Sequence, residues 1–226
     1  MKKILMAVFV SMCIFPVAGN AQGIEDGDGM VSLYGGLGSA LEKSMIEVDG
    51  ENLSWGNFGA EMGLSYLYFP TSYLGLGLDV HLANFKGTQM VEDVRGRWFW
   101  HTLESDFDMQ TLQLMGAGRI NLNPQSPVRL YIPFGAGLTL SNGTMKYTWD
   151  EEFDLGEESV TDASWGGYVG LGLEFDQGTN YSWSIEARYN VFDYDDSRLA
   201  GDIGGALVGK DTRRSYVSLA FRLNFG

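Results

Sequence analysis

Residues 73–85 read YLGLGLDVHLANF, and apolar side chains alternate with small or polar ones along this stretch. One face of the extended chain carries Leu74, Leu76, Leu78, Val80 and Leu82. The opposite face carries Gly75, Gly77, Asp79 and His81. Because successive side chains of a β-strand point to opposite sides, this period of two predicts a strand between two different environments.

Seven further segments repeat the same period, and glycine is frequent, with 31 of the 226 residues. They are residues 30–40, 55–68, 107–122, 128–140, 163–175, 181–192 and 214–225. No segment after residue 21 is apolar over the ~20 residues that a transmembrane helix needs. The sequence therefore predicts an all-β protein of eight strands, which crosses a membrane only as a closed barrel.

The segments between these strands alternate between short and long. The short ones, at 69–72, 123–127 and 176–180, are rich in Pro, Asn, Gly and Ser, which favour tight turns. The long, polar ones are residues 41–54, 86–106, 141–162 and 193–213. This alternation predicts an eight-stranded antiparallel up-and-down transmembrane β-barrel with short periplasmic turns and long extracellular loops.

The N-terminus has the pattern of a signal peptide. Lys2 and Lys3 precede an apolar run at 4–17, which is too short to span a bilayer, and small residues surround Ala21. The predicted units are a signal peptide at 1–21, a short N-terminal periplasmic segment at 22–29 and an outer-membrane barrel at 30–226.

Charge and cysteine content narrow the possible partners and the source of stability. Loss of Lys2 and Lys3 with the signal peptide changes the net charge from −14 to −16, which argues against a nucleic-acid partner. The single cysteine, Cys13, leaves with the same segment, so we expect no disulfide in the exported chain.

The face opposite the apolar one carries the charged residues of the predicted strands. We assign to the lumen Glu61, Asp79, His81, Arg119, Arg129, Glu174, Glu186, Arg188 and Arg222. An eight-stranded barrel is only wide enough inside for side chains to fill it. Four acids against four arginines predict a charge network in which the groups neutralise one another and plug the lumen.

Aromatic residues gather near both ends of the predicted strands. Tyr66, Trp183 and Phe225 lie at the short-turn end, while Phe107 and Trp165 lie near the long segments. Membrane barrels carry such aromatic girdles at both interfaces with water. We therefore predict two belts of outward-facing rings.

The motifs YIPFGAGL at 131–138, GYVGLGLEF at 167–175 and WSIEARY at 183–189 resemble OmpA/OmpX- and opacity-type eight-stranded outer-membrane barrels, a porin-like family. The last strand is similar to the signal read by the barrel assembly machinery, with Tyr216, Leu219, Phe221, Leu223 and Phe225. The resemblance implies a cell outer-membrane location, with outer-membrane lipid and the assembly machinery as partners. Gly226 departs from a pattern that usually ends on an aromatic residue. Pro133 predicts a bulge or a break, because proline donates no ladder hydrogen bond.

Two segments of the long connections are candidate sites. Residues 95–100 mix cationic and aromatic side chains, as recognition surfaces often do, and the candidate residues are Arg95, Arg97, Trp98, Phe99 and Trp100. Residues 141–162 are strongly acidic, yet their spacing matches no ordered calcium loop. We expect a solvated acidic loop and no metal site, with divalent-cation binding as the alternative.

Catalysis finds little support in the sequence. Acyl chemistry needs a nucleophile beside a base, and only His81 and His101 are present. His81 has no evident nucleophile in its own strand, and neither histidine lies in a motif that resembles outer-membrane deacylases or acyltransferases. We predict no catalytic residue and no cofactor. The expected function is a non-enzymatic barrel with a plugged lumen, whose loops serve surface interaction, adhesion or envelope integrity. The alternatives are a small porin for ions or solutes and, with less support, a lipid-modifying enzyme or a soluble ligand-binding barrel.

Overall fold

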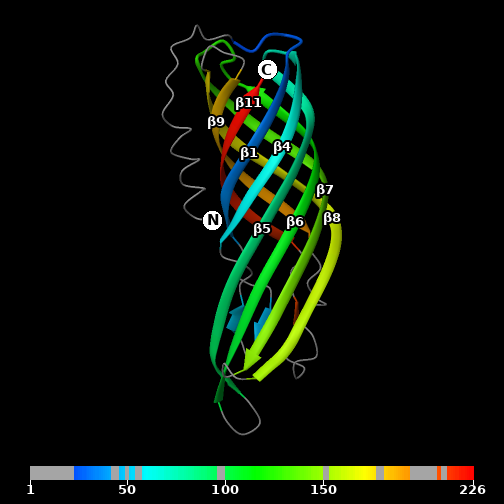
Figure 1. The fold of residues 1–226 in the computed structure, drawn as a ribbon, viewed down its shortest axis with the longest axis vertical. Coiled ribbons are helices and arrows are strands. Elements are labelled where there is room, and N and C mark those ends of the chain that lie inside the picture. Colours follow the sequence, from blue (N-terminus) through cyan, green and yellow to red (C-terminus); the bar gives the residue numbers. More distant parts are fainter. Residues whose placement is uncertain are drawn as a thin grey trace.

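A computed structural model describes residues 23–41, 46–48, 51–53, 58–95, 100–149, 153–176, 181–193, 208–209 and 213–226. It confirms the predicted fold class, because eight antiparallel strands close into one barrel in the order β1-β11-β9-β8-β7-β6-β5-β4 (Figure 1). These strands are β1 (Gly29–Ala40), β4 (Phe58–Thr71), β5 (Leu74–Arg95), β6 (Trp100–Asn121), β7 (Val128–Trp149), β8 (Phe153–Asp176), β9 (Tyr181–Asp193) and β11 (Arg213–Phe225). The predicted signal peptide and the turn at 177–180 lie outside the described residues.

Closure comes from β1, which pairs with β4 on one side and with β11 on the other. A path through successive paired residues that starts at Thr161 on β8 returns to β8 at Leu171, ten residues away. Eight strands with this stagger are tilted by about 40° to the barrel axis. The resulting interior is narrow, so side chains fill it.

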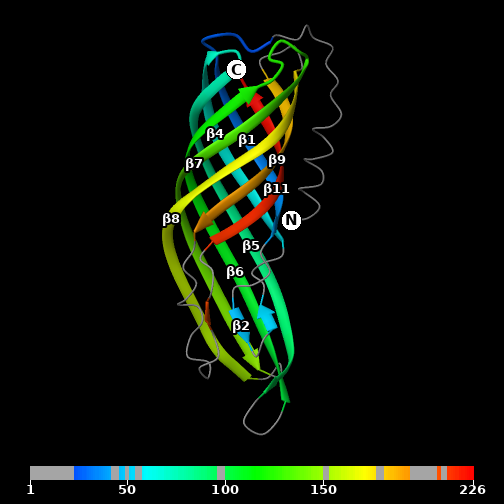
Figure 2. The same ribbon diagram turned by 180° about the vertical axis from the view of Figure 1, so that it is seen from behind.

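The barrel strands differ in length. β5, β6 and β7 have 22 residues each and β8 has 24, whereas β1, β4, β9 and β11 have 12 to 14. The four long strands continue past the others as a curved sheet at the end away from the C-terminus (Figures 1 and 2). We call the part of these strands beyond the closed barrel the projecting sheet, comprising residues 87–95, 100–107, 145–149 and 153–160.

The projecting sheet corrects the prediction that residues 86–106 and 141–162 are long loops. Their polar residues are paired across the strands: Lys86 Nζ lies 2.5 Å from Asp108 Oδ2, and Thr88 donates a hydrogen bond of 2.5 Å to Asp106. In the projecting sheet the described outward side chains are polar, whereas inward ones such as Phe107 and Met145 are apolar. The polar face resembled a loop in composition, so the strands were not predicted. Residues 96–99 and 150–152, between the long strands, lie outside the described residues.

Three further short strands form a separate small sheet in the order β10-β2-β3. They are β2 (Ile46–Val48), β3 (Glu51–Leu53) and β10 (Val208–Gly209), and they lie toward the projecting sheet (Figure 2). The sequence analysis assigned these residues to loops. Within the described ranges, no helix is long and apolar enough to cross a membrane.

The two faces of the barrel wall have opposite polarity. Outward side chains are apolar and well exposed, with Leu78 at 67% and Met62 at 61%, while inward charged side chains are buried. A water-soluble protein has the reverse arrangement, so this wall fits a lipid surrounding.

Of two local predictions, the one for Phe107 is wrong and the one for Pro133 is confirmed as a break in the pairing. Phe107, expected in an outward aromatic belt, is 3% exposed and faces inward, because its strand enters the projecting sheet with the opposite polarity. At Pro133 the pairing of β7 with β8 is interrupted between Tyr131 and Phe134, yet the register is the same on both sides. The proline therefore produces a break without a bulge.

Candidate functional site

The centre of the lumen is organised around the carboxylate of Glu186 on β9. Arg222 Nη1 donates to both carboxylate oxygens, at 3.0 and 2.9 Å, and Tyr131 donates its hydroxyl at 2.8 Å. Arg188, two residues along the same strand, also donates to Glu186. Residues two apart on a strand share a face, so this sequence spacing places the guanidinium beside the carboxylate.

Asp79 on β5 forms the second centre, held by two tyrosines and an arginine. Tyr34 donates to Asp79 Oδ1 at 2.6 Å, and Tyr168 donates to Oδ2 at 3.0 Å. Arg188 Nη2 lies 3.3 Å from Oδ2 and its guanidinium stacks between the two rings, 4.6 Å from that of Tyr34 and 4.4 Å from that of Tyr168. Cation–π contacts of this kind are strongest when water is excluded.

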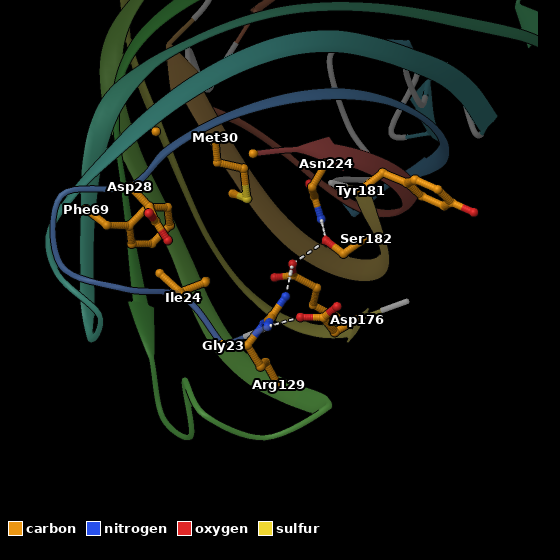
Figure 3. A pocket seen from close by; sticks show the side chains of 13 residues that line it. Gly23, Ile24, Asp28, Met30, Phe69, Arg129, Asp176, Tyr181, Ser182 and Asn224 are labelled. Carbon is orange, nitrogen blue, oxygen red and sulfur yellow. Dashed lines mark hydrogen bonds and ion pairs between the residues drawn. The ribbon is translucent and has the colours of Figure 1, made fainter. Parts of the chain in front are cut away.

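A third cluster lies toward the short-turn end. Arg129 donates to Glu174 at 2.7 Å and to Asp176 at 2.6 Å, while Arg119 and Ser182 donate to Glu174 as well. All of them except Arg119 line a cavity of about 110 Å³, where Arg129 points toward Asp176 and the side chains of Ser182 and Asn224 meet (Figure 3). Each charge in this cluster therefore faces a charge of opposite sign.

A fourth cluster contains the buried histidine. His81 Nε2 lies 3.1 Å from Glu61 Oε2, and its Nδ1 lies 3.2 Å from Gln113 Oε1. The ring therefore lies within hydrogen-bond distance of a carboxyl group on one side and an amide group on the other. The structure thus brings all nine of the predicted lumen residues into four linked clusters.

Apolar side chains pack inside the barrel toward both of its ends. At the short-turn end the cluster contains Ile24, Met30, Leu67, Phe69 and Ala117. At the projecting end the buried inward residues are Phe85, Phe107, Met109, Met145 and Phe192. The charged clusters lie next to these apolar side chains, and surroundings of low polarity strengthen the attraction between opposite charges.

The short-turn layer includes residues before the first strand. Gly27 donates to the Phe69 carbonyl at 2.7 Å and Phe69 donates to the Asp28 carbonyl at 2.8 Å, so this segment runs beside the end of β4. Gly27 has φ of +98°, a conformation that favours glycine. Residues 23–28 thus place the side chain of Ile24 in the apolar cluster at the short-turn end of the lumen.

Inward glycines make room for the tyrosines of the network. A Cβ atom at Gly63 would collide with the ring of Tyr34, and one at Gly172 would collide with the ring of Tyr131. Glycine in a strand interior often marks such a close approach. The sequence analysis did not use Tyr34, although it shares its face of β1 with the buried Ser32, and that parity could have identified it.

Two further charged residues of the lumen were missed, Arg214 and Asp176. Arg214 is fully buried and has the same parity on β11 as Arg222, which was the available signal. Asp176 ends β8 and forms an ion pair with Arg129, but its place in an expected turn concealed it.

The other candidate residues lie outside this network. Leu219, Phe221, Leu223 and Phe225 point outward from β11, whereas Tyr216 points inward and is fully buried. Arg95 and Trp100 are paired at the tip of β5 and β6, and residues 97–99 lie outside the described residues. The acidic residues 150–152 lie outside them too. Among the described residues, no three His, Cys, Asp or Glu side chains gather as metal ligands would.

Comparison with known proteins places this architecture in a family. The sequence matches the family model of the outer membrane protein beta-barrel domain over residues 7–225. No curated protein matches the chain.

Three solved structures are similar to this chain at low sequence identity. Neisserial surface protein A has 16% identity, with 87% of this chain and 96% of that protein covered and a TM-score of 0.51. The attachment invasion locus protein Ail of Yersinia pestis has 17% identity, coverage of 88% and 99%, and a TM-score of 0.46. OprG of Pseudomonas aeruginosa has 16% identity, coverage of 91% and 99%, and a TM-score of 0.47. The closed eight-stranded barrel and the family match agree, and the chain belongs to the outer-membrane β-barrel proteins.

Proposed function

We propose that this outer-membrane protein is a non-enzymatic barrel with a closed lumen, whose projecting sheet makes contacts outside the cell in surface interaction, adhesion or maintenance of the envelope. The observation that carries the proposal is the charged core of the lumen, in which acids and arginines pair with one another, with apolar side chains packed toward both ends.

An ion that crosses this lumen would have to separate buried ion pairs. Glu186 faces two guanidinium groups, and Asp79 lies beside the guanidinium of Arg188. Breaking a buried pair costs about 3–5 kcal/mol, because it leaves a charge without its partner. The cavity next to Asp79, Arg119 and Arg222 measures only about 10 Å³, which is the size of one water probe. These features support a plug.

The lumen clusters also lack the arrangement that acyl chemistry needs. The groups within hydrogen-bond distance of the buried His81 are a carboxylate and an amide, and neither is a nucleophile of the Ser or Cys type. Its neighbours hold the imidazole in place on both sides. The geometry therefore supports a structural histidine.

The projecting sheet is the part of the described molecule that the membrane span does not require. Its strands β5 to β8 continue past the ends of β4 and β9, and the described outward side chains of this part include the polar Thr88, Asp106 and Lys146. A chain that orders these residues loses conformational entropy without gaining lipid contacts. A role in contacts beyond the membrane would account for that ordering.

Planar-bilayer recording of the purified, folded protein tests the closed lumen. We expect no stable opening. A double variant, Tyr34→Ala with Arg188→Ala, removes two side chains that fill the centre and shows whether the assay detects an open lumen. Stable and sizeable openings of the unaltered protein would overturn the plug.

A shortened barrel tests the role of the projecting sheet. In this variant tight turns replace residues 89–105 and 146–157, which leaves the pairs Thr88–Asp106 and Met145–Glu158 in place. We expect cells that carry it to adhere less to epithelial monolayers and plastic, or to become more sensitive to detergent if the sheet serves the envelope. Unchanged adhesion and unchanged detergent resistance would remove the proposed role.

One observation favours a small porin as the second candidate. The hydroxyl oxygens of Ser32, Thr111 and Thr139 are buried inside the barrel and have no hydrogen-bond partner among the described residues. A file of water molecules through the lumen would satisfy them. The same bilayer recording separates this function from the closed barrel.

A further inference from the structure

A groove lies on the barrel wall where β4 to β8 run side by side, away from the tip of the projecting sheet. Most of its lining residues face outward, and the inward residues Glu61, Ala83, Thr111 and Ser141 line it between them. It is an open groove with a volume of about 640 Å³. Its outward lining changes from apolar to polar across three successive rows of residues.

The floor of the groove is a row of three carboxamides and one hydroxyl. Asn84, Gln110, Asn142 and Thr161 are direct partners across β5, β6, β7 and β8. Asn84 donates to Asp108 at 2.8 Å and Thr161 donates to Asn142 at 3.3 Å. The carboxamide of Gln110, at the centre of the row, forms no hydrogen bond within the described part of the chain.

The rows on either side of this floor are different. Toward the short turns, the adjacent row is apolar and consists of Met62, Leu82, Leu112 and Leu140. Toward the projecting sheet, Lys86 is bound to Asp108 in an ion pair. Adjacent rows of one face lie about 7 Å apart along the strands. Along the strands, the outward side chains thus change from apolar, through amide, to charged over a distance comparable to the thickness of a lipid headgroup layer.

The groove rises across the membrane boundary, because the strands are tilted and its floor runs perpendicular to them. Its β4 end, beside Met62, belongs to the apolar band, and its β8 end, at Thr161, belongs to the polar region. An occupant that follows the groove must be apolar at one end and polar at the other. It is therefore an amphiphile of the outer leaflet.

We propose that this groove binds the junction between the sugar and the acyl chains of an outer-leaflet glycolipid. Carboxamides both donate and accept hydrogen bonds, which suits sugar hydroxyls and the amide links of acylated amino sugars. Esters and phosphates of phospholipids only accept. Since Lys86 is already paired with Asp108, the phosphates of the glycolipid contribute less than its sugar.

The test uses the folded full chain in phosphatidylcholine nanodiscs that contain lipid A or phosphatidylethanolamine at equal mole fraction, with native mass spectrometry as the readout. We expect preferential retention of lipid A. The double variant Gln110→Leu with Asn142→Leu should weaken its retention about tenfold, through the loss of hydrogen bonds to the amides. Raising the ionic strength should change little, because the charged row is neutralised internally.

A matched variant keeps the experiment specific. Ser39→Leu with Tyr189→Leu changes outward residues of β1 and β9, on strands that do not line the groove, and should leave lipid A retention unchanged. Heat-modifiable migration confirms that each variant is folded. Equal retention of both lipids by the unaltered protein, an unchanged Gln110/Asn142 double variant, or loss of lipid A at high ionic strength would each overturn the proposal.

Discussion

The closed barrel and the projecting sheet share four strands but have opposite polarity. On β6, the outward residues Leu114 and Leu112 are followed toward the projecting sheet by Gln110 and Asp108, while the inward residues change from Gln113 to Met109. The apolar face of this strand therefore points outward where lipid surrounds the barrel, and it points inward in the part of the strand beyond the lipid. The reversal shows that the surroundings of each segment, rather than strand periodicity, decide which face is apolar.

The largest expected effect comes from the buried charges of the barrel. Glu186→Gln leaves Arg188 and Arg222 without their shared carboxylate and should lower the free energy of unfolding by about 4 kcal/mol. Urea titration of the folded protein in lipid vesicles measures it. A decrease in the free energy of unfolding of less than about 1 kcal/mol, as for a surface ion pair, would show that the network contributes little to stability.

The next effect tests the polarity of the outer wall. Leu114→Arg places a charge in the apolar band and should lower the free energy of unfolding by about 3 kcal/mol, with less heat-modifiable protein in the membrane. The matched variant is Gln110→Arg, on the same face of the same strand but at the polar row, where we expect little change. Equal effects of both variants would place the membrane boundary elsewhere.

A third variant tests the inward apolar face near the projecting sheet. Met109→Ala removes a fully buried side chain and should cost about 2 kcal/mol, because the surrounding side chains fill the cavity only in part. Its neighbour on the opposite face provides the control, since Gln110→Ala should leave the unfolding midpoint unchanged. A neutral Met109→Ala would mean that this layer is not packed.

The smallest effect is expected for an ion pair outside the barrel. Lys86 is 69% exposed, and Lys86→Gln should change the free energy of unfolding by less than about 0.5 kcal/mol. Measured beside Glu186→Gln, it compares the same kind of interaction inside and outside the lumen. A large loss for Lys86→Gln would contradict the assignment of this row to the aqueous side.

The family fold was accessible from the sequence because a barrel strand has a simple local signature. The alternation in 73–85 identified both faces of β5, and short turns after β4 and β6 set the order of the strands. The projecting sheet was not accessible, because paired polar residues such as Lys86 and Asp108 have the composition of a loop.

The lumen residues were identified by their parity, but their partners were not. Nothing along the chain says that Asp79 is held by Tyr34 and Tyr168, which are 45 and 89 residues away. The groove on the outer wall was also invisible, since Gln110 and Asn142 become neighbours only through the pairing of β6 with β7. Long-range neighbours depend on register, which local sequence does not encode.

The sequence by itself determined the eight strands, the closed all-β architecture and the parity of most of the charged lumen residues, because side-chain direction in a strand follows directly from position. Only the tertiary structure decided the stagger of the closed barrel, the pairing of acids with arginines and the continuation of four strands beyond the membrane. These depend on which residues of different strands lie opposite one another. That choice is made when the sheet closes on itself and all its neighbours are fixed together.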